Sequence, residues 1–586
     1  MSQGQASSFA HARALVGGWR ASGVRHIVIC PGSRSAPVAF AVAEAERAGL
    51  LRVHVRHDER AAAFLALGLG AAGGSPAVVV TTSGTAVANL HPAVWEAWHS
   101  AVPMILATAN RPEHLHGTWA SQTTEHQRTV FGDAVRLRIG LEVVAGVDAC
   151  DDWATAAARA VAAASGSPGC AAVVARPGPV HLDLGFVEPL VPTGADASPS
   201  GARPLPATGS GNASAPMPGA ATHTLPAQAA TVVVAGDGAG PQATVLAEDA
   251  GWPLFAEPSS GAFARPGATK VSLNAIPAYR LLLDTPVAQH ISRVITFGRP
   301  TLSRPVTALL NRPDVEVIHV ARPGEAGPPR VHQRLEGRVD ASETCVHPDW
   351  LRIWQHAGAA AEQILDSAGS DSAGVKPSHA QQLSPLRVAE LAVQACRAED
   401  AMVVAASNAV RDLDLVAHRL PPGVPVWANR GLAGIDGTIG TAIGVAVGMR
   451  RRTRVLAGDL AFLHDVGSLS VPQMERAAVP AVQIIVLNDD GGGIFELLEP
   501  AGQVPGFGRD TFERFFGTPH GNGIGALCAG FAVPHVVVRD EDGLRAQLAR
   551  PPAGVSVVEV GLDRRFRRRQ AARLQGAVRT RLRAQA

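Results

Sequence analysis

Two aspartates, thirty positions apart, are the residues of this sequence whose types and spacing most directly suggest chemistry. Asp459 lies in AGDLAFLHD and Asp489 in VLNDDGGGIFELL, and each follows an apolar run typical of a buried strand. Because the carboxyl ends of neighbouring parallel strands share one edge of a sheet, both carboxylates are expected at one crevice. With the backbone carbonyl of Gly491 they would form an oxygen site suited to Mg²⁺ holding a diphosphate. A helix expected after Gly493 would direct its N–H groups at the same phosphates.

A glutamate at the start of an apolar segment is the second candidate. Glu59 stands in HDERAAAFLALG, after the strand-like LRVHVRH and before a helix of small apolar side chains. One interpretation is a first-turn acid favoured by the helix dipole, and the other is a catalytic carboxylate. The residues of this stretch alone leave both interpretations open.

The elements that must position these residues follow a repeating pattern. Short apolar runs such as HIVIC, AVVVTT, PMILATA and AAVVA alternate with alanine-rich helical stretches up to residue 190, and the alternation returns over 231–365 and 386–565. This rhythm predicts parallel sheets with helices on both faces. We therefore expect an α/β fold of three doubly wound domains with mainly parallel sheets. The expected domains are 1–190, 231–365 and 386–586, separated by linkers at 191–230 and 366–385 that are rich in small and polar residues.

The composition excludes several classes of function. The 586 residues carry 52 basic and 50 acidic side chains, a net charge of +2, so no overall field points to nucleic acid or a membrane surface. The six cysteines form no CxxC pair, which argues against a zinc site or a disulfide framework. The start lacks the pattern of a signal peptide and no apolar stretch is long enough for a membrane span, so a cytoplasmic protein is expected. The basic tail RRFRRRQAARLQGAVRTRLRAQA predicts a packed or solvated C-terminal helix rather than a nucleic-acid arm.

The two aspartate motifs together resemble the metal-binding signature of the thiamine diphosphate enzymes. That resemblance implies thiamine diphosphate and Mg²⁺ (or Mn²⁺) as cofactors. Leu460 stands where the family usually has the last glycine of GDG, and Asp489 stands where asparagine is more usual. An aspartate is a competent metal ligand, so the site survives while its cation preference stays open. The implied metal ligands are Asp459, Asp489 and the carbonyl of Gly491, and the further cofactor contacts are Gly492, Ile494 and Ile435.

The same resemblance assigns a role to Glu59. The family places a glutamate of its first domain against N1′ of the aminopyrimidine, and Glu59 matches that position. A carboxyl group bonded to N1′ stabilises the imino tautomer, whose 4′-imine removes the thiazolium C2 proton, and a water-poor pocket strengthens that bond. The resemblance also implies a pyrimidine-binding domain at 1–190, a diphosphate-binding domain at 386–586 and an active site between subunits. A homodimer is then the smallest expected assembly, and a homotetramer is compatible.

Within this family, the stretches CPGSRSAP, SQTTEH, SNAVRDLDLV and ANRGLAGIDG resemble the group that serves menaquinone biosynthesis. The resemblance implies decarboxylation of 2-oxoglutarate and 1,4-addition of the succinyl carbanion equivalent to isochorismate. Both substrates are multiply anionic, and arginine forks suit their carboxylates. The implied catalytic and substrate-binding residues are Ser33, Arg34, Arg111, Gln122, Arg304, Ser407, Arg411 and Arg430, besides Glu59.

Alternatives remain open at this stage. Structural roles would be a solvated turn for Arg34, salt bridges for the other arginines and an ordinary core position for Ile435. A rival enzyme is another thiamine diphosphate carboligase or decarboxylase such as acetolactate synthase, against which the number of arginines argues. A rival of another class is a nucleotide-binding or regulatory module that uses GDGAG and the basic tail. The histidines that invite a catalytic reading, but are expected to be structural, are His54, His57, His464 and His520.

Overall fold

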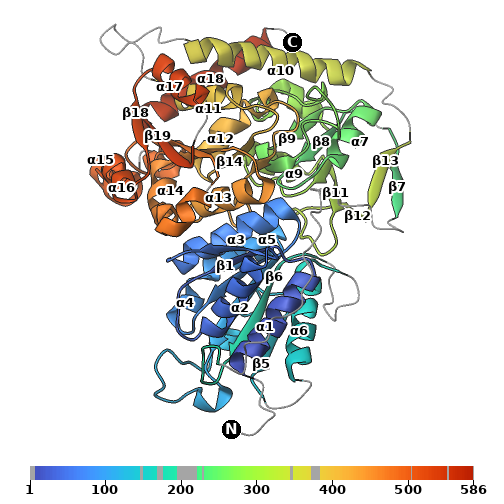
Figure 1. Cartoon of the computed structure of the whole chain (residues 1–586). Coiled ribbons are helices and arrows are strands. Elements are labelled where there is room, and N and C mark those ends of the chain that lie inside the picture. Colours follow the sequence, from blue (N-terminus) through green and yellow to red (C-terminus); the bar gives the residue numbers. More distant parts are fainter. Residues whose placement is uncertain are drawn as a thin grey trace. The chain divides into compact units, whose positions relative to one another are not determined.

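The structure is a computed structural model that describes residues 7–144, 149–167, 176–193, 221–227, 230–342, 348–370, 383–478, 480–502, 504–550 and 553–584. The chain folds into two compact units (Figure 1). Unit 1 comprises residues 1–214, 429–451 and 464–480, and unit 2 comprises residues 215–428, 452–463 and 481–586. Among the helices of the described ranges, none combines the length and the apolar character that crossing a bilayer requires.

The strands of unit 1 are β1 (His26–Ile29), β2 (Arg52–Val55), β3 (Ala77–Thr81), β4 (Met104–Asn110), β5 (Arg138–Glu142) and β6 (Pro179–Gly185). The strands of unit 2 are β7 (Thr222–Leu225), β8 (Thr231–Ala235), β9 (Leu254–Ala256), β10 (Arg293–Phe297), β11 (Glu316–Ala321), β12 (Gln333–Glu336), β13 (Arg338–Ala341), β14 (Ala401–Val404), β15 (Val426–Trp427), β16 (Thr453–Gly458), β17 (Val482–Asn488), β18 (His535–Val538) and β19 (Val555–Gly561).

Three large sheets are built from parallel strands. Unit 1 holds a six-stranded sheet of order β2-β1-β3-β4-β6-β5, and unit 2 holds a five-stranded sheet, β12-β11-β10-β8-β9, and a six-stranded sheet, β15-β14-β16-β17-β19-β18. When the strands of each six-stranded sheet are counted in chain order, both sheets have the order 2-1-3-4-6-5. The winding reverses beside the first strand of each, which is the doubly wound arrangement. The expected α/β class with parallel sheets is confirmed.

The principal helices of unit 1 are α1 (Ser8–Ala21), α2 (Ala36–Arg47), α3 (Glu59–Gly73), α5 (His91–Ser100), α6 (Ala149–Ala164) and α13 (Thr438–Met449). Those of unit 2 are α7 (Gln242–Ala250), α9 (Arg304–Leu310), α10 (Pro348–Ser370), α11 (Pro385–Gln394), α12 (Asn408–Asp414), α14 (Asp459–His464), α16 (Ile524–Gly530), α17 (Glu541–Ala549) and α18 (Arg567–Arg583).

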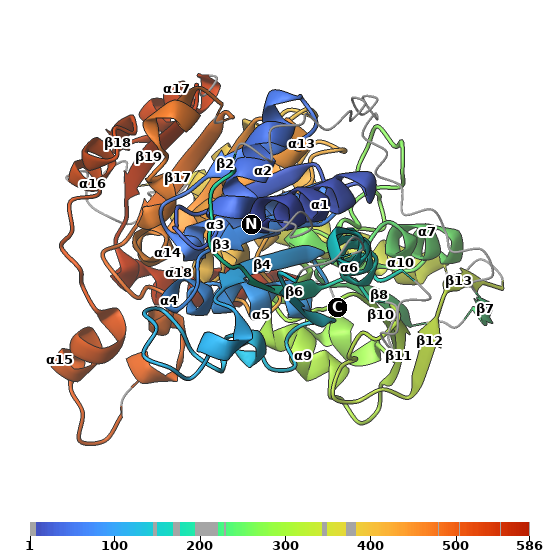
Figure 2. The same ribbon diagram turned by 60° about the horizontal axis from the view of Figure 1, so that its bottom comes forward.

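Helices cover both faces of the unit 1 sheet. α1, α2 and α6 pack together on one face, where Trp19 and Trp153 join the apolar core (Figure 2). α3 and α5 pack against each other on the other side, and α3 also packs along α13. The axes of α3 and α13 approach closely because each of these two helices has a glycine where they cross. A Cβ atom on Gly68 would lie 2.1 Å from the Thr441 carbonyl oxygen, and one on Gly444 would lie 2.3 Å from the Leu65 carbonyl oxygen.

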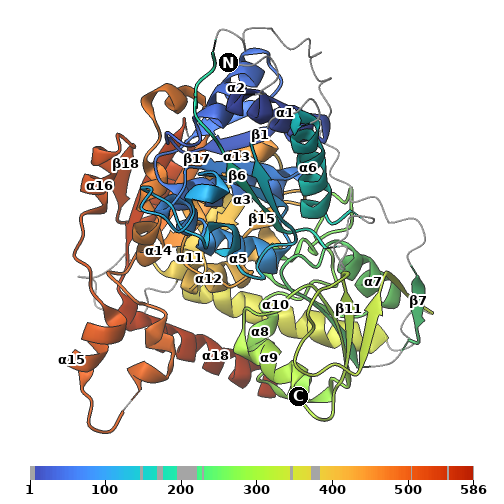
Figure 3. The same ribbon diagram turned by 90° about the horizontal axis from the view of Figure 1, so that it is seen from below.

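The basic tail of the chain forms the long helix α18 in unit 2. Leu574, Val578 and Leu582 recur every four residues and are buried, as expected for one apolar helix face. α18 packs against α10, and the two helices run close together in Figures 1 and 3. The tail is therefore a packed helix whose arginines lie mostly on its exposed side.

Two local expectations differ from the structure, and a third lies outside the described residues. The run AAVVA lies within residues 168–175, outside the described residues, whereas β6, which was not predicted, carries polar His181 and Asp183 among its buried residues. β7 lies inside the segment expected as a linker and pairs with β13. The α-helix expected after Gly493 is wrong, because residues Phe495–Leu497 form a single 3-10 turn. Pro500 lacks the N–H that an α-helix would bond to the Glu496 carbonyl.

Candidate active site

The two predicted acidic residues lie where β16 and β17 end. β16 ends at Gly458 and α14 begins at Asp459, while β17 ends at Asn488, immediately before Asp489. The two strands are direct neighbours in the sheet. A hydrogen bond of 2.9 Å runs from the Gly491 N–H to Asp459 Oδ2 and ties the two strand ends together. The predicted convergence of these residues at one edge of the sheet is therefore observed.

The loop after β17 has a backbone shape that requires glycine at Gly491. Its φ of +134° is in the region that disfavours side chains, and a Cβ atom there would lie 2.0 Å from the Gly517 carbonyl oxygen. The neighbouring Gly492 N–H donates to that carbonyl at 2.7 Å. The His520 ring nitrogen Nε2 lies 3.2 Å from the same carboxylate oxygen, Asp459 Oδ2, that accepts from the Gly491 N–H. Backbone and imidazole contacts thus fix the orientation of the Asp459 carboxylate.

Asp489 is held by an arginine from the C-terminal helix. Arg567 Nε donates to Asp489 Oδ2 at 2.9 Å, and its NH1 group donates to Asp412 Oδ2 at 3.1 Å. The side chains of Arg567 and Asp489 are only 7 % and 5 % exposed, so this ion pair is buried. Arg567 therefore balances the negative charge that Asp489 adds at a position where the resembling family usually has a neutral asparagine.

The acidic pair has the chemistry of a site for a divalent cation. Burial raises the pKa of Asp459, and burial also raises the pKa of Asp489 to about 6, opposed by Arg567 and increased by the charge of Asp459. Two buried carboxylates that disfavour each other's charge are stabilised by a cation. Over the described ranges, the side chains of His, Cys, Asp and Glu form no cluster of three or more placed to hold a metal. The predicted donor set of two carboxylates and one carbonyl contains only two such side chains, so it stays a prediction.

Other candidates of unit 2 divide into two groups. Ser407, with φ +70°, is the N-cap of α12. The Arg411 guanidinium donates a hydrogen bond to the backbone carbonyl oxygen of Ser407. These two residues follow β14, the strand next to β16 in the sheet. Arg304 instead forms an exposed bidentate pair with Glu499, at 2.6 and 3.1 Å, and the two side chains are 71 % and 74 % exposed. The structure therefore groups Ser407 and Arg411 with the acidic pair and leaves Arg304 in a surface ion pair.

Glu59 occupies the first turn of α3 in unit 1. The N-cap is the preceding residue, Asp58, whose carboxylate accepts hydrogen bonds from the N–H groups of Arg60 and Ala61 at 2.8 and 3.1 Å. Because Asp58 satisfies the helix N-terminus, Glu59 is not needed as the cap. The Glu59 side chain is half-buried. Burial raises the pKa of the Cys30 thiol, which follows β1, and the nearby charge of Glu59 raises it further.

The arginines predicted in unit 1 lie beside the loop that carries Gln122. Arg111 donates from NH1 to the Gln122 carbonyl at 3.1 Å and from NH2 to Ser121 Oγ at 3.3 Å. Burial lowers the pKa of Arg34, and the positive charge of Arg111 lowers it further, so the two guanidinium groups share one neighbourhood. Gln122 has a positive φ of 56°, a conformation that is costly for a side-chain-bearing residue and is common at functional sites. Ser33, in the turn after β1, is exposed.

The segment before α13 carries the last two candidates. Arg430 is buried and Ile435 is half-buried. Glu96 holds this segment in place, since its carboxylate accepts hydrogen bonds from the N–H groups of Gly431 and Leu432 at 2.6 and 2.9 Å. A cavity of about 310 Å³ lies here, lined in part by Trp95, Glu96, Leu432 and Asp436. The segment is thus an ordered wall of a cavity in unit 1.

Several residues that position the site were not predicted from the sequence. Arg567 and Glu96 act through contacts to residues that are distant in the sequence, so no local pattern announces them. Asp58 could have been found, because an aspartate directly before a helix is a capping signal. In unit 1 the structure holds Ser33, Arg34, Glu59, Arg111, Gln122, Arg430 and Ile435. In unit 2 it holds Arg304, Ser407, Arg411, Asp459, Asp489, Gly491, Gly492 and the half-buried Ile494.

Comparison with known proteins places the chain in a family. Residues 10–130 match the thiamine pyrophosphate enzyme N-terminal TPP binding domain. A 2-succinyl-5-enolpyruvyl-6-hydroxy-3-cyclohexene-1-carboxylate synthase of Kineococcus radiotolerans is 45 % identical, covering 95 % of this chain and 96 % of its own. Synthases of the same name from Paenarthrobacter aurescens and Nocardioides sp. are 44 % and 42 % identical, covering 98 % and 96 % of this chain and 98 % and 96 % of their own. The chain therefore belongs to the 2-succinyl-5-enolpyruvyl-6-hydroxy-3-cyclohexene-1-carboxylate synthase family of thiamine diphosphate enzymes.

Proposed function

We propose that this protein decarboxylates 2-oxoglutarate and adds the resulting succinyl unit to isochorismate by 1,4-addition, forming 2-succinyl-5-enolpyruvyl-6-hydroxy-3-cyclohexene-1-carboxylate for menaquinone biosynthesis. The observation that carries the proposal is the convergence of Asp459 and Asp489 at neighbouring strand ends in a chain with full-length similarity to synthases of that name. The comparisons do not favour the rival carboligases, such as acetolactate synthase. The rival of another class, a nucleotide-binding module, would not account for this acidic pair.

The residues of unit 2 would hold the charged end of the cofactor. Asp459, Asp489 and the Gly491 carbonyl would bind Mg²⁺ or Mn²⁺, which neutralises a diphosphate. The cofactor contacts proposed alongside them are Gly492 and Ile494, with Ile435 of unit 1 against its rings. When bound, thiamine diphosphate supplies the nucleophilic carbon and the electron sink that decarboxylation requires.

The residues of unit 1 would control the proton and the substrates. Glu59 would hydrogen-bond N1′ of the aminopyrimidine, a task for which it is available because Asp58 caps the helix. Arg34 and Arg111 supply neighbouring positive charges for substrate carboxylates. Gln122, whose loop Arg111 holds, would contact the reacting groups. Further proposed carboxylate contacts are Ser33, Ser407, Arg411, Arg430 and Arg304, of which Arg304 would have to leave Glu499.

The proposed assembly is a homo-oligomer in which unit 1 of one subunit and unit 2 of another share each active site. This follows from the family resemblance and gives a dimer as the smallest active form. We also propose a cytoplasmic location, because the pathway's substrates are small charged metabolites. Neither nucleic acid nor a membrane is a proposed partner.

The decisive experiment compares Glu59→Gln with the parent enzyme. Purified protein is assayed with 2-oxoglutarate and isochorismate, with and without thiamine diphosphate and Mg²⁺, while cofactor binding is measured by calorimetry. Removing a proton-transfer group costs on the order of 10²- to 10⁴-fold in turnover, whereas cofactor affinity should change little. Glu316→Gln, a substitution at an exposed strand residue, is the matched control and should retain full turnover. Unchanged turnover in Glu59→Gln would refute the assigned role, and turnover with pyruvate but not with 2-oxoglutarate would refute the proposed reaction.

A further inference from the structure

A second cavity lies in unit 2 and is lined by arginines. Its volume is about 410 Å³, and the five arginines in its lining are Arg397, Arg452, Arg454, Arg545 and Arg550. Among the residues that the structure describes, no aspartate or glutamate lines it. Arg454 is the second residue of β16, whereas Asp459 follows the last residue of that strand. A strand rises about 3.3 Å per residue, so this arginine cavity lies at the opposite end of the sheet from the acidic pair.

Carboxylates outside the lining balance two of these arginines. Arg452 NH2 lies 2.7 Å from Asp400 Oδ1 and 3.1 Å from Glu399 Oε1. Arg545 NH2 lies 2.8 Å from Glu541 Oε1. These two guanidinium groups are therefore paired at the edge of the cavity before any ligand arrives.

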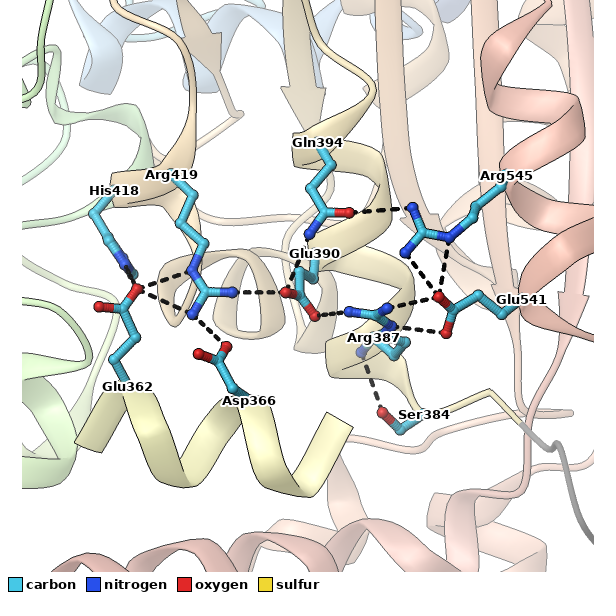
Figure 4. A network of polar contacts seen from close by, with 10 residues as sticks. All are labelled: Glu362, Asp366, Ser384, Arg387, Glu390, Gln394, His418, Arg419, Glu541 and Arg545. Carbon is cyan, nitrogen blue, oxygen red and sulfur yellow. Dashed lines mark hydrogen bonds and ion pairs between the residues drawn. The ribbon is translucent and has the colours of Figure 1, made fainter. Parts of the chain in front are cut away.

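Glu541 belongs to a larger network that fixes this wall of the cavity (Figure 4). Arg387 contacts both Glu541, at 2.6 Å, and Glu390, while Arg419 contacts Glu390 at 2.6 Å. Figure 4 shows Gln394 between Glu390 and Arg545. The NH1 group of Arg545 donates to the side-chain oxygen of Gln394 at 3.4 Å. Arg419 also contacts Glu362 of α10 at 3.0 Å, so the network ties α10, α11 and α17 together. The α11 and α17 walls of the cavity are therefore held in place by contacts that do not depend on a ligand.

Arg454 is the buried member of the set. It is 7 % exposed, and its guanidinium donates to the Gln483 side chain and to the backbone carbonyls of Ala395 and Leu548, at 3.2 and 2.9 Å. Within the described ranges its Nε has no hydrogen-bond acceptor, and no carboxylate forms an ion pair with it. Cys396, which also lines the cavity, supplies no negative charge, because burial raises the pKa of its thiol to about 12. A buried guanidinium whose partners are all neutral is costly and is stabilised by an anion.

The exposed arginines add to this unbalanced charge. In the part of the chain that the structure describes, no carboxylate is paired with the side chain of Arg397 or of Arg550. Together with Arg454 they leave three positive charges facing one space. Leu391 and Leu548 supply an apolar part of the lining. We propose that the arginine cavity is a binding site for a small organic molecule that carries a di- or triphosphate, distinct from the candidate active site.

Charge and size favour this class of ligand. A diphosphate or triphosphate carries several negative charges on adjacent groups, which matches three guanidinium groups that lack carboxylate partners, and arginine binds phosphate oxygens in a bidentate manner. The volume is in the range of small-molecule pockets, about 300 to 1,000 Å³. The leucines suit the organic part of such a molecule.

Calorimetry of the full-length protein tests the proposal, with pyrophosphate and ATP as probes in 150 mM KCl and EDTA. The titrations are repeated in Asp459→Ala, because removing the proposed metal ligand separates this site from the diphosphate site of the cofactor. We expect one saturable site per chain with a dissociation constant below about 1 mM for at least one probe, unchanged in Asp459→Ala. The double variant Arg397→Ala/Arg550→Ala should weaken binding at least ten-fold, as expected for the loss of two charged contacts.

The matched control is Arg573→Ala/Arg581→Ala, which removes the same charge from exposed positions of α18 outside the cavity. It should leave the affinity within about two-fold, because exposed charges outside the cavity are largely screened at this salt concentration. Equal weakening by both double variants would overturn the proposal in favour of a general charge effect. Saturable binding of citrate without binding of either phosphate probe would overturn the ligand class. Binding of a short RNA but of neither small probe would overturn the assignment as a small-molecule site, as would the absence of any saturable binding.

Discussion

Replacing Arg567 by methionine should expose how strongly the C-terminal helix and the candidate metal site depend on each other. The substitution keeps most of the side-chain volume but leaves Asp489 and Asp412 without the guanidinium that lies 2.9 and 3.1 Å from them. Removing one partner of a buried ion pair costs about 3 to 5 kcal/mol, because the other charge stays buried and unpaired. The exposures of 7 % and 5 % place this pair in that class. We therefore expect a loss of about 3 to 5 kcal/mol in the free energy of unfolding.

A double-mutant cycle with Asp489→Asn isolates the interaction. Asp489→Asn alone should cost about 1.5 to 3 kcal/mol, the value of a hydrogen bond to a charged group, since Arg567 retains Asp412. The double variant carries no unpaired charge at position 489, so its loss should be smaller than the sum of the single losses. We expect a coupling of about 1 to 3 kcal/mol between the two substitutions.

The assay is urea unfolding at pH 7, followed by far-ultraviolet circular dichroism and tryptophan fluorescence. EDTA is present and thiamine diphosphate is absent, because a bound ligand would add its own stabilisation. The two signals must coincide for the free energies to be compared. Single losses that add within about 0.5 kcal/mol would show that the pair contributes no coupling and would refute this account of Asp489.

Two further predictions concern other parts of the fold. Gly444→Ala should destabilise the protein by about 1 to 3 kcal/mol in urea unfolding, because the new methyl group would lie 2.3 Å from the Leu65 carbonyl oxygen. The control is Gly73→Ala, whose new Cβ would meet no atom of the described residues within 4 Å, and it should be neutral or stabilising. Asp414 has a pKa raised to about 6 by burial, opposed by Arg280, so the folded state holds this proton more tightly than the unfolded state does. Stability contributed through this group is present at pH 4 and falls as the pH rises to 6, by roughly 2 to 3 kcal/mol. Asp414→Asn should remove that fall, so its stability relative to the parent should increase from pH 4 to pH 6.5, and a constant difference would contradict the assignment.

The sheets were predictable because buried parallel strands are nearly continuous apolar runs. AVVVTT became β3, and the runs before Asp459 and Asp489 became β16 and β17. The site followed from these strands, since knowing where two neighbouring strands end locates the residues just beyond them. β6 escaped because polar His181 and Asp183 interrupt its apolar pattern, although both are buried in the fold.

What remained hidden was the set of contacts between distant segments. Arg567 is 78 positions from Asp489, and its sequence context is a basic tail that reads as solvated surface. The glycines at the crossing of α3 and α13 likewise give no local signal of which helix they meet. The 3-10 turn after Gly493 differs, because a local signal was present in the sequence. Pro500 disfavours an α-helix there, but the expectation of a phosphate-binding helix was given more weight.

The glycine-to-glycine crossing of α3 and α13 also determines how the polypeptide can be dissected. Unit 1 is completed by residues 429–451 and 464–480, so an expression fragment ending at residue 214 would lack α13. The flank of α3 around Gly68 would then be exposed to water, including the Leu65 carbonyl oxygen that Gly444 approaches in the intact unit. Such a fragment should aggregate or bind a helix of another molecule at this flank. Adding residues 429–480 as a separate peptide should restore its solubility.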